Sequence, residues 1–305
     1  MSAPIRVGLV GAGPWAGMFT APMLAAAADL TLAAVWARRP EAAAALAHEH
    51  GLPAAGSFDA LLAACDAVAF AVPAEVQAPL AASAARAGKH LLLEKPVAFT
   101  VAEAEAVAAA VDEAGVATQL VLTYRFTPQV RDFLAAAGGP VAYVRTAFLG
   151  DGALAGSPFA TPWRRAARAA VLDLGPHTLD LAEAVAGPAV RLRAAEAGGV
   201  VAVETVHEAG ARGHVALSLT TPGGGALEAD AATAAGRVVL ADPTPREPAA
   251  VWRAITDAFA AAVRGPVPEP LDVHRLDVHR GVRLQRLLAA VGEALDGGGA
   301  VSVER

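Results

Sequence analysis

The sequence predicts an α/β protein with two domains: a doubly wound parallel sheet, followed by an α+β domain with an antiparallel or mixed sheet. Over residues 5–122, apolar strand-like segments alternate with helical ones, a rhythm typical of βαβ units. After residue 124, strand-like segments follow one another at hairpin spacing, which indicates antiparallel or mixed pairing. A length of 305 residues is enough for two domains. We therefore expect domains at residues 1–122 and 123–305.

The first domain is expected to hold alternating strands and helices. Its strands are apolar runs at residues 5–10, 30–36, 67–72, 90–93 and 118–122. Its helices run from the turn after the first strand to about residue 28, and over residues 40–50, 58–64, 78–87 and 101–114. Gly88 and Gly115 follow the last two helices, and glycine is a common residue at a helix C-terminus.

The second domain is expected to be richer in strands. Its strands cover residues 141–149, 190–196, 199–206, 212–220, 225–231 and 237–241. Its helices cover residues 130–137, 174–186, 248–263 and 272–295, and a loop rich in Gly and Pro runs over 150–162.

Composition and charge exclude several classes of protein. The net charge is −6 without a basic stripe, which argues against nucleic-acid binding. No apolar run suits a membrane span, and residues 1–6 do not resemble a signal peptide. Cys65 is the only cysteine, which excludes an internal disulfide and a cysteine-cluster metal site. We expect a cytoplasmic protein that binds a small molecule. We expect no metal site, because four histidines lack a spacing with carboxylates that would suit metal ligands: His207, His214, His274 and His279.

A glycine-rich turn follows the first predicted strand. Residues 11–16 (GAGPWA) fit G-x-G-x-x-A between a strand and a helix, a pattern typical of dinucleotide binding. Gly11 allows the tight turn, Gly13 lets the backbone approach a pyrophosphate, and Ala16 lets helix and strand pack closely. Pro14 suits the first helical turn, and Trp15 lies beside it at the helix N-terminus, which attracts phosphates. The alternative is an ordinary strand–turn–helix with small residues.

Glu94, Lys95 and Pro96 close the fourth predicted strand. Ligands bind at the carboxyl ends of strands in open α/β sheets, and a lysine there can exchange a proton with a substrate hydroxyl during hydride transfer. The alternative is that Glu94 and Lys95 form a charged pair that closes a strand. We also expect a cis Lys95–Pro96 bond, because the strand must turn sharply here.

Four segments together resemble the Gfo/Idh/MocA oxidoreductases, a family that includes glucose–fructose oxidoreductase and inositol dehydrogenase. They are residues 66–73 (DAVAFAVP), 87–96 (AGKHLLLEKP), 123–128 (TYRFTP) and 173–180 (DLGPHTLD). The resemblance covers most of the first 186 residues in the right order. The chain departs from the family pattern at Gln77, where a histidine is common, and at residues 165–170, which replace a glycine-rich run.

The resemblance implies a Rossmann domain and a second domain with an open, mostly antiparallel sheet. It also implies that Lys95, Asp173 and His177 meet beside the nicotinamide, where lysine and histidine handle the hydroxyl proton and aspartate orients them. Taken alone, Asp173 has the alternative of a helix N-cap, with Pro176 in the first turn. His177 has the alternative of a buried histidine bonded to backbone.

Further contacts are expected around these motifs. Those with the cofactor come from Val72, Pro73, Glu94 and Lys95. Those with the substrate come from Tyr124, Arg125, Trp163, Arg164 and His177. The alternative for Tyr124 and Arg125 is a solvated domain junction.

The end of the second predicted strand favours NADP(H) over NAD(H). An NAD site usually has an acidic residue there to accept from the ribose 2′-hydroxyl, but Ala37 occupies that position. Arg38 and Arg39 follow, and a guanidinium can bind a 2′-phosphate through two parallel hydrogen bonds. The alternative is that both arginines are solvated, with Glu41 as partner. We expect NADP as cofactor, with NAD as the second choice.

These features predict an oxidoreductase that transfers hydride between NAD(P) and a hydroxyl or carbonyl carbon of a sugar, cyclitol or related polyol. Two alternatives stay open: a non-catalytic, cofactor-binding regulator of the same fold, and a reductase of an imine or a tetrapyrrole. The resembling enzymes pair through the exposed face of the second-domain sheet, so we expect a homo-oligomer, either a dimer or a tetramer. We expect that apolar face to include Val201, Val203, Val215 and Leu217.

Overall fold

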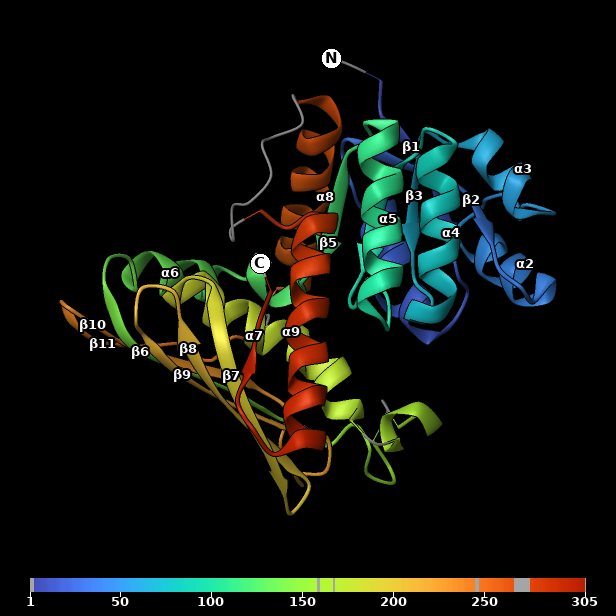
Figure 1. Cartoon of the computed structure of the whole chain (residues 1–305). Helices are drawn as coiled ribbons and strands as arrows, with labels where there is room; N and C mark the ends of the chain where they lie inside the picture. Colours follow the sequence, from blue (N-terminus) through green and yellow to red (C-terminus); the bar gives the residue numbers. More distant parts are fainter. Residues whose placement is uncertain (1–2, 158–159, 167, 245–246, 266–274, 305) are drawn as a thin grey trace. The chain divides into compact units, whose positions relative to one another are not determined.

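The computed structural model describes residues 3–157, 160–166, 168–244, 247–265 and 275–304 (Figure 1). The chain forms two compact units. The first comprises Met1–Thr123 and Glu247–Val282, and the second comprises Tyr124–Arg246 and Arg283–Arg305. We expected everything after residue 122 to form one domain, whereas the described residues 247–265 and 275–282 group with the first unit.

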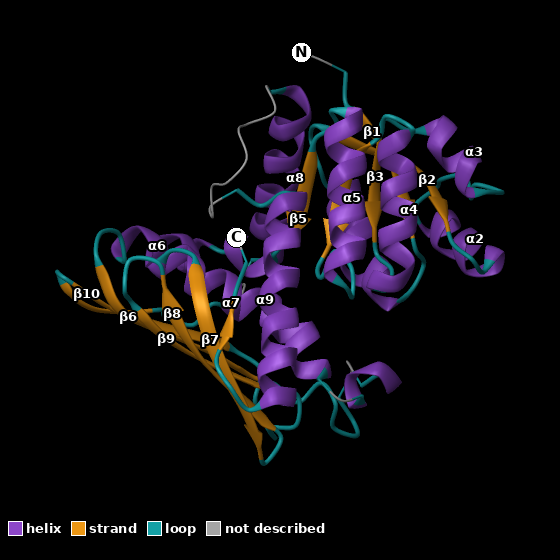
Figure 2. Cartoon of the chain, viewed as in Figure 1, coloured by secondary structure: helices purple, strands orange, loops and turns teal. Residues whose placement is uncertain are grey.

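The first unit contains a parallel sheet of five strands, in the order β2-β1-β3-β4-β5 (Figure 2). The strands are β1 (Ile5–Val10), β2 (Leu30–Trp36), β3 (Ala67–Phe70), β4 (His90–Glu94) and β5 (Thr118–Val121). Every neighbouring pair is parallel. The predicted doubly wound sheet is therefore confirmed.

Helices cover both faces of this sheet. They are α1 (Ala21–Ala25), α2 (Pro40–Glu49), α3 (Phe58–Ala64), α4 (Ala74–Arg86), α5 (Val101–Ala114) and α8 (Pro248–Arg264). The chain moves in one direction from β1 to β2 and in the other from β3 to β5. Because such crossovers are right-handed, this reversal puts α1 on one face and α4 and α5, which pack side by side, on the other.

Two helix boundaries in this unit differ from the prediction. The first helix includes a π-helical turn, η1 (Ala16–Thr20), and α1 ends at Ala25 rather than near residue 28. Helix α4 begins at Ala74 rather than 78, because the Pro73 carbonyl already accepts from the backbone N–H of Val76 and Gln77 (both 2.9 Å). Its early start places Gln77 in the first turn.

The last predicted helix also begins later than expected. Helix α9 covers Val278–Gly297, and Asp277 Oδ1 accepts from the backbone N–H of His279 (3.0 Å) and Arg280 (3.1 Å), which is an N-cap arrangement. Asp277 therefore starts the helix, and residues 275–277 are not helical. Residues 272–274 of the predicted helix, including His274, lie outside the described residues.

The second unit contains a sheet of seven strands, in the order β11-β10-β6-β9-β8-β7-β12. The strands are β6 (Val141–Leu149), β7 (Ala189–Ala197), β8 (Val200–His207), β9 (Arg212–Ser218), β10 (Leu227–Thr233), β11 (Gly236–Val239) and β12 (Val301–Ser302). Only the β6–β9 pair is parallel among the pairings of these strands. The open, mostly antiparallel sheet is confirmed, although β12 was not predicted.

Short helical segments complete the second unit. They are η2 (Thr123–Phe126), which begins at the last residue of the first unit, α6 (Pro128–Ala136), η3 (Pro162–Arg165) and α7 (Ala169–Ala186). Helix α7 packs on β6 and β9. Thr146 Oγ1 on β6 donates to the Thr178 carbonyl on α7 (3.2 Å), so the inner face of the sheet lies against this helix.

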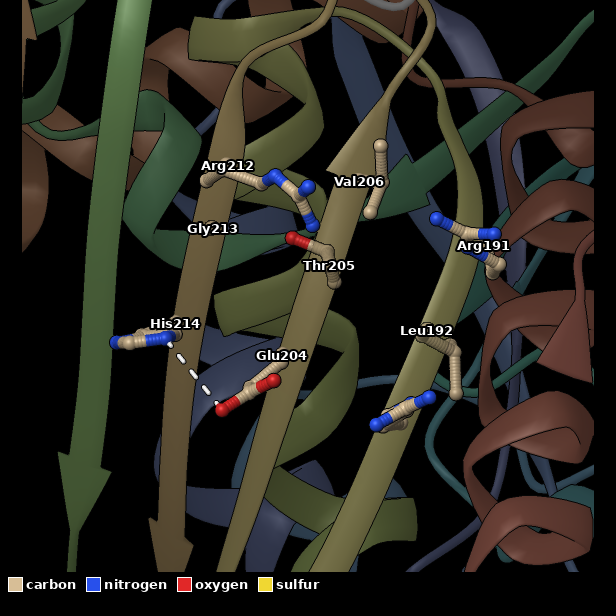
Figure 3. A pocket seen from close by; sticks show the side chains of 9 residues that line it. Arg191, Leu192, Glu204, Thr205, Val206, Arg212, Gly213 and His214 are labelled. Atoms are coloured by element: carbon tan, nitrogen blue, oxygen red, sulfur yellow. Dashed lines mark ion pairs between the residues drawn. The ribbon is translucent and has the colours of Figure 1, made fainter. Parts of the chain in front are cut away.

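The outer face of this sheet is polar, which corrects the predicted apolar face. Val201, Val203, Val215 and Leu217 are at most 3% exposed. They belong to the inner face, since a Cβ built on Gly175 of α7 would lie 3.9 Å from Leu217 Cδ1. The opposite face carries charged side chains on β7, β8 and β9 (Figure 3), namely Arg191, Arg193, Glu204, Arg212 and His214.

A half-buried histidine, His90, makes the stability of the first unit sensitive to pH. The His90 Nδ1 accepts from the backbone N–H of Ala117 (3.0 Å), which requires this nitrogen to be unprotonated. Burial lowers the pKa of His90 below its ordinary value of 6.5. Below pH 6.5, His90 therefore binds a proton more readily in the unfolded chain than in the folded chain. The free energy of unfolding falls as the pH falls.

We expect His90→Gln to flatten this dependence. As the pH falls below 6.5, the wild-type free energy of unfolding should fall, with a contribution from this one group of at most about 1.4 kcal/mol per pH unit, and the variant should lose that contribution. Urea titrations at each pH measure it. The exposed His48 is the control, and His48→Gln should keep the wild-type slope. An unchanged slope in His90→Gln would contradict the assignment.

Candidate active site

The glycine turn after β1 has the geometry that its sequence predicts. Gly11 has φ +117°, and its N–H donates to the Trp36 carbonyl at the end of β2 (2.8 Å). A Cβ at this position would lie 2.4 Å from the carbonyl oxygen of Ala71. Only glycine fits here, because both the left-handed backbone and the close approach of β3 exclude a side chain.

The other two small residues of the turn have different surroundings. A Cβ on Gly13 would meet nothing within 4 Å, so the space above this backbone is open. Ala16 is fully buried against the unit's core. The helix begins between them at Pro14 and Trp15. An open glycine at a helix N-terminus, with a small residue packed one turn later, fits the pyrophosphate of a dinucleotide.

Three of the predicted cofactor segments lie at one edge of the sheet. The glycine turn follows β1, Val72 and Pro73 follow β3, and Glu94 ends β4. Since these strands are parallel neighbours, their carboxyl ends meet at the same edge. The strand order reverses at β1 and β3, and ligands bind at such a switch point in open α/β sheets.

Trp15 connects the glycine turn to the Glu94 turn. Its Nε1 donates to Glu94 Oε1 (2.7 Å), and its ring stacks on Phe19 with centroids 4.6 Å apart. The second carboxylate oxygen of Glu94 accepts from the backbone N–H of Lys95 (3.3 Å). The Glu94 carboxylate therefore links the Trp15 side chain of the glycine turn to the backbone of Lys95.

Lys95 is half-buried directly after β4. The Lys95–Pro96 peptide bond is cis, as predicted. Only two of the chain's 24 basic residues are lysines. The other, Lys89, donates from Nζ to the Cys65 carbonyl (2.9 Å) and has a structural partner.

The residues after β2, where the NADP site is predicted, are accessible. Ala37 is half-buried, and Arg38 and Arg39 are exposed. Within the described residues, neither guanidinium has a hydrogen bond or an ion pair, and Glu41 does not serve as their partner. Both arginines are therefore available to a ligand.

In the second unit, Asp173 and His177 lie inside helix α7. The helix was expected to begin at residue 174, but it begins at Ala169, after Arg168 with φ +65°. Asp173 is therefore not an N-cap, and Pro176 lies within the helix. Both Asp173 and His177 are buried, with 5% and 8% exposure. One helical turn separates them, so their side chains share a face.

Arg164 is the partner of Asp173. Its Nε lies 2.7 Å from Asp173 Oδ2, and its guanidinium carbon lies 5.3 Å from the centre of the Trp163 ring. The Trp163 ring is 40% exposed. The structure thus brings together three residues that were predicted separately, two as substrate contacts and one as catalytic.

His177 packs against two aromatic rings, which also contact each other with centroids 5.6 Å apart. The Tyr124 ring meets it edge-on, with centroids 5.2 Å apart, and the Phe148 ring lies 6.4 Å away. Burial raises the pKa of Tyr124 to about 12, so its phenol stays protonated at neutral pH and can donate a hydrogen bond. Phe148 was not predicted. Its place on the inner face of β6 follows from the alternation of that strand.

Arg125 has a partner within its own unit. Its Nη1 lies 2.7 Å from Asp180 Oδ2, and both side chains are almost fully buried. A buried pair of this kind explains why the two residues are present, because either charge alone would be costly. The substrate contact expected for Arg125 stays a prediction.

Gln77 is the residue of this region whose role the sequence did not show. It is fully buried and hydrogen-bonds to the backbone on both sides of Lys95. The available signal was a polar residue four positions after Pro73, at the place where a histidine is common in the family.

Neither a metal-binding cluster nor a membrane-spanning helix is present in the described residues. No group of three His, Cys, Asp or Glu side chains there is placed to hold a metal ion. None of the helices in the described ranges combines the length and apolarity needed to cross a membrane.

Comparison with known proteins identifies the family. The sequence model of the Gfo/Idh/MocA oxidoreductase family, which has an NAD-binding Rossmann fold, matches residues 5–121. The D-xylose 1-dehydrogenase (NADP(+)) 2 of Haloferax volcanii is 30% identical to this chain. The alignment, 326 positions long, covers 91% of this chain and 94% of that protein. The chain belongs to the Gfo/Idh/MocA family. It is a nicotinamide-dependent oxidoreductase.

Solved structures show the same fold along the whole length. GenD2 from gentamicin A biosynthesis, in complex with NAD, has a TM-score of 0.86 at 24% identity and covers 100% of this chain and 98% of its own. Levoglucosan dehydrogenase, in complex with NADH and levoglucosan, has a TM-score of 0.81 at 20% identity, with 99% of each chain covered. The Gfo/Idh/MocA fold therefore extends beyond residue 186, where the sequence resemblance ended.

Proposed function

We propose that this Gfo/Idh/MocA protein transfers hydride between NADP and a hydroxyl or carbonyl carbon of a sugar, cyclitol or related polyol. The observation that carries the proposal is the place of Lys95, at the sheet edge that also holds the glycine turn. The Trp15–Glu94 hydrogen bond ties these two segments together. The relatives named above act on a sugar or sugar derivative by name, D-xylose in one case and levoglucosan in another, which supports this substrate class.

The proposed roles of the residues are those that the resemblance to the Gfo/Idh/MocA family implies. Bound NADP supplies the position that takes up or gives the hydride. Lys95 exchanges the hydroxyl proton as general acid/base, His177 is its proton partner, and Asp173, held by Arg164, orients them. The residues proposed to hold the cofactor are Gly11, Gly13, Pro14, Trp15, Ala16, Ala37, Arg38, Arg39, Val72, Pro73, Glu94 and Lys95.

The second unit is proposed to bind the substrate. Tyr124 contributes a phenol that remains a donor, and Arg164 and Trp163 contribute a charge and an exposed ring. Arg125 and His177 complete the proposed set of substrate contacts. A polyol suits these groups because hydroxyls both donate and accept hydrogen bonds.

A turnover assay tests the proposed function. The purified protein is given NADP⁺ or NAD⁺ with a panel of polyols, sugars and sugar acids, and the reduced cofactor with imines and a tetrapyrrole. We expect reduction of cofactor by at least one polyol or sugar. Turnover with an imine or the tetrapyrrole, and with no polyol or sugar, would contradict the proposed substrate class and favour a reductase of imines or tetrapyrroles. Tight cofactor binding without turnover on any compound would favour the non-catalytic regulator.

Cofactor preference is expected to depend on Arg38. With no carboxylate at Ala37 to repel a 2′-phosphate and a free guanidinium beside it, NADPH should bind more tightly than NADH. Arg38→Ala should reduce this preference by about tenfold, the equivalent of about 1.4 kcal/mol.

Titrations of both cofactors at one ionic strength measure the ratio, because salt screens phosphate contacts. Arg86, which ends helix α4, is the control, and Arg86→Ala should keep the wild-type ratio. Equal affinity for NADPH and NADH in the wild type, or an unchanged ratio in Arg38→Ala, would contradict the prediction.

We also propose that the protein is a cytoplasmic homo-oligomer, joined through the outer face of the seven-stranded sheet. That face carries both signs of charge, with Arg191, Arg193 and Arg212 near Glu204, so two copies can pair opposite charges. Light scattering should show a species larger than 30.6 kDa, and Arg191→Glu with Arg193→Glu should weaken it. A 30.6 kDa species alone at all micromolar concentrations would contradict it.

A further inference from the structure

The Gln77 side chain hydrogen-bonds to backbone atoms on both sides of Lys95. Its Oε1 accepts from the backbone N–H of Glu94 (2.8 Å). Its Nε2 donates to the carbonyl oxygens of Glu94 (2.8 Å), Pro96 (3.2 Å) and Val97 (3.1 Å). The amide therefore binds the chain immediately before Lys95 and immediately after it.

A primary amide matches this set of partners. It offers one acceptor toward a backbone N–H and two N–H donors toward a cluster of carbonyl oxygens. Glutamate has the same shape but no donor when ionised, so it would face three carbonyl oxygens without a proton to share. The Gln77 side chain is fully buried, so bulk solvent does not reach it to replace such lost hydrogen bonds.

Position matters for Lys95 because a lysine side chain is a flexible four-carbon stem. Its amine reaches a defined point only if the backbone that carries it is fixed. The Trp15–Glu94 bond holds a side chain of this turn, and Gln77 holds its main chain. The two contacts come from different segments, the glycine turn and helix α4.

We propose that Gln77 is the positioning residue for Lys95: its amide fixes the Glu94–Val97 backbone and thereby the place of the lysine amine. This inference rests on the proposed function of Lys95. Gln77 itself takes no part in proton exchange, and its effect on turnover passes through Lys95.

Gln119 provides a matched control in the same unit. It is also buried (6% exposed), and its Nε2 donates to two carbonyl oxygens, those of Leu120 (3.0 Å) and Leu276 (2.8 Å). It makes no described contact with residues 94–97. Gln77→Glu and Gln119→Glu therefore remove comparable hydrogen bonds, but only the first removes them around Lys95.

The experiment measures kcat, KM and urea stability for Gln77→Glu, Gln77→His and Gln119→Glu. It also follows the two lysines directly. After reductive methylation with ¹³C-formaldehyde, Lys89 and Lys95 give the only lysine signals, since the chain has no other lysine. Lys89→Arg assigns them, and Lys89 serves as the internal reference.

We expect Gln77→Glu to lower kcat by about 10- to 100-fold, as for a group displaced by about 1 Å, and to shift the Lys95 signal but not that of Lys89. Gln77→His keeps one acceptor and one donor, so it should restore most of kcat and return the Lys95 signal toward the wild-type position. Gln119→Glu should lose stability while keeping kcat and both lysine signals. If Gln77→Glu does not fold, the proposal is tested by Gln77→His alone, in which we expect a smaller shift of the Lys95 signal and none of the Lys89 signal.

Two results would overturn the proposal. One is a Lys95 signal that stays at its wild-type position in both Gln77 variants. The other is an equal loss of kcat in Gln119→Glu, which would show a general loosening of the unit. The NMR readout needs no turnover, so it remains valid even if Lys95→Ala keeps full activity and the proposed function of Lys95 fails.

Discussion

Lys95→Ala is expected to reduce turnover by about 10²–10⁴-fold, the usual loss when a general acid/base is removed. Lys95 lies at the carboxyl end of β4, where a substrate hydroxyl would need a proton acceptor during hydride transfer. Cofactor affinity should stay within a few-fold of the wild-type value, because the glycine turn and the residues after β2 are untouched. Steady-state kinetics and a cofactor titration measure the two effects separately.

The chain offers a natural control for this substitution. Lys89 is the only other lysine, and its Nζ contacts the Cys65 carbonyl (2.9 Å). Lys89→Ala should keep wild-type kcat and lose only some stability. Wild-type turnover in Lys95→Ala would remove the general acid/base from the proposal, whatever the control does.

Gly11→Ala and Gly13→Ala are expected to give opposite results, although only two positions separate them. A methyl group on Gly11 would meet the Ala71 carbonyl oxygen at 2.4 Å, in a backbone conformation that L-residues rarely adopt. Gly11→Ala should therefore destabilise the first unit by at least about 2 kcal/mol. Thermal or urea unfolding measures this loss.

A methyl group on Gly13 would meet no protein atom within 4 Å. Gly13→Ala should change stability by less than about 0.5 kcal/mol. If the cofactor's pyrophosphate approaches this backbone, as proposed, the methyl group should weaken cofactor binding by at least tenfold, about 1.4 kcal/mol. Unchanged affinity in a stable Gly13→Ala protein would refute the proposed cofactor contact at this residue.

The sequence predicted the first unit well because local signals and tertiary demands agree there. The β1 run Ile5–Val10, the G-x-G-x-x-A turn and the glycine after helix α5 each have one favourable structure. The start of α7 was missed because Asp173 and Pro176 imitate an N-cap and a first turn. Packing against the sheet instead extends the helix back to Ala169, and Asp173 is used for the Arg164 pair.

Two other features depend on partners distant in sequence. The role of Gln77 becomes visible only from its hydrogen bonds to residues 94–97, about twenty positions away. The role of Arg125 likewise becomes visible only from its ion pair with Asp180. Similarly, the alternation of Val201 and Val203 identifies one apolar face of a strand but not which side the helix covers. The periodicity of apolar residues and the helix or strand propensity of a segment do not reveal which distant residues it will contact.

Both sheets are protected at their edges. β2 is bordered by residues 53–55, since the Val35 N–H donates to the Pro53 carbonyl and the Val35 carbonyl accepts from the Ala55 N–H, and Leu276 accepts from the backbone of β5. In the other sheet, β12 has only two residues and β11 has four, with Arg237 paired to Asp230. Within the part of the chain that the structure describes, short, charged or covered edges offer little unpaired backbone for strand addition by another molecule. We therefore expect the described edges of these two open sheets to disfavour edge-to-edge aggregation through the main chain.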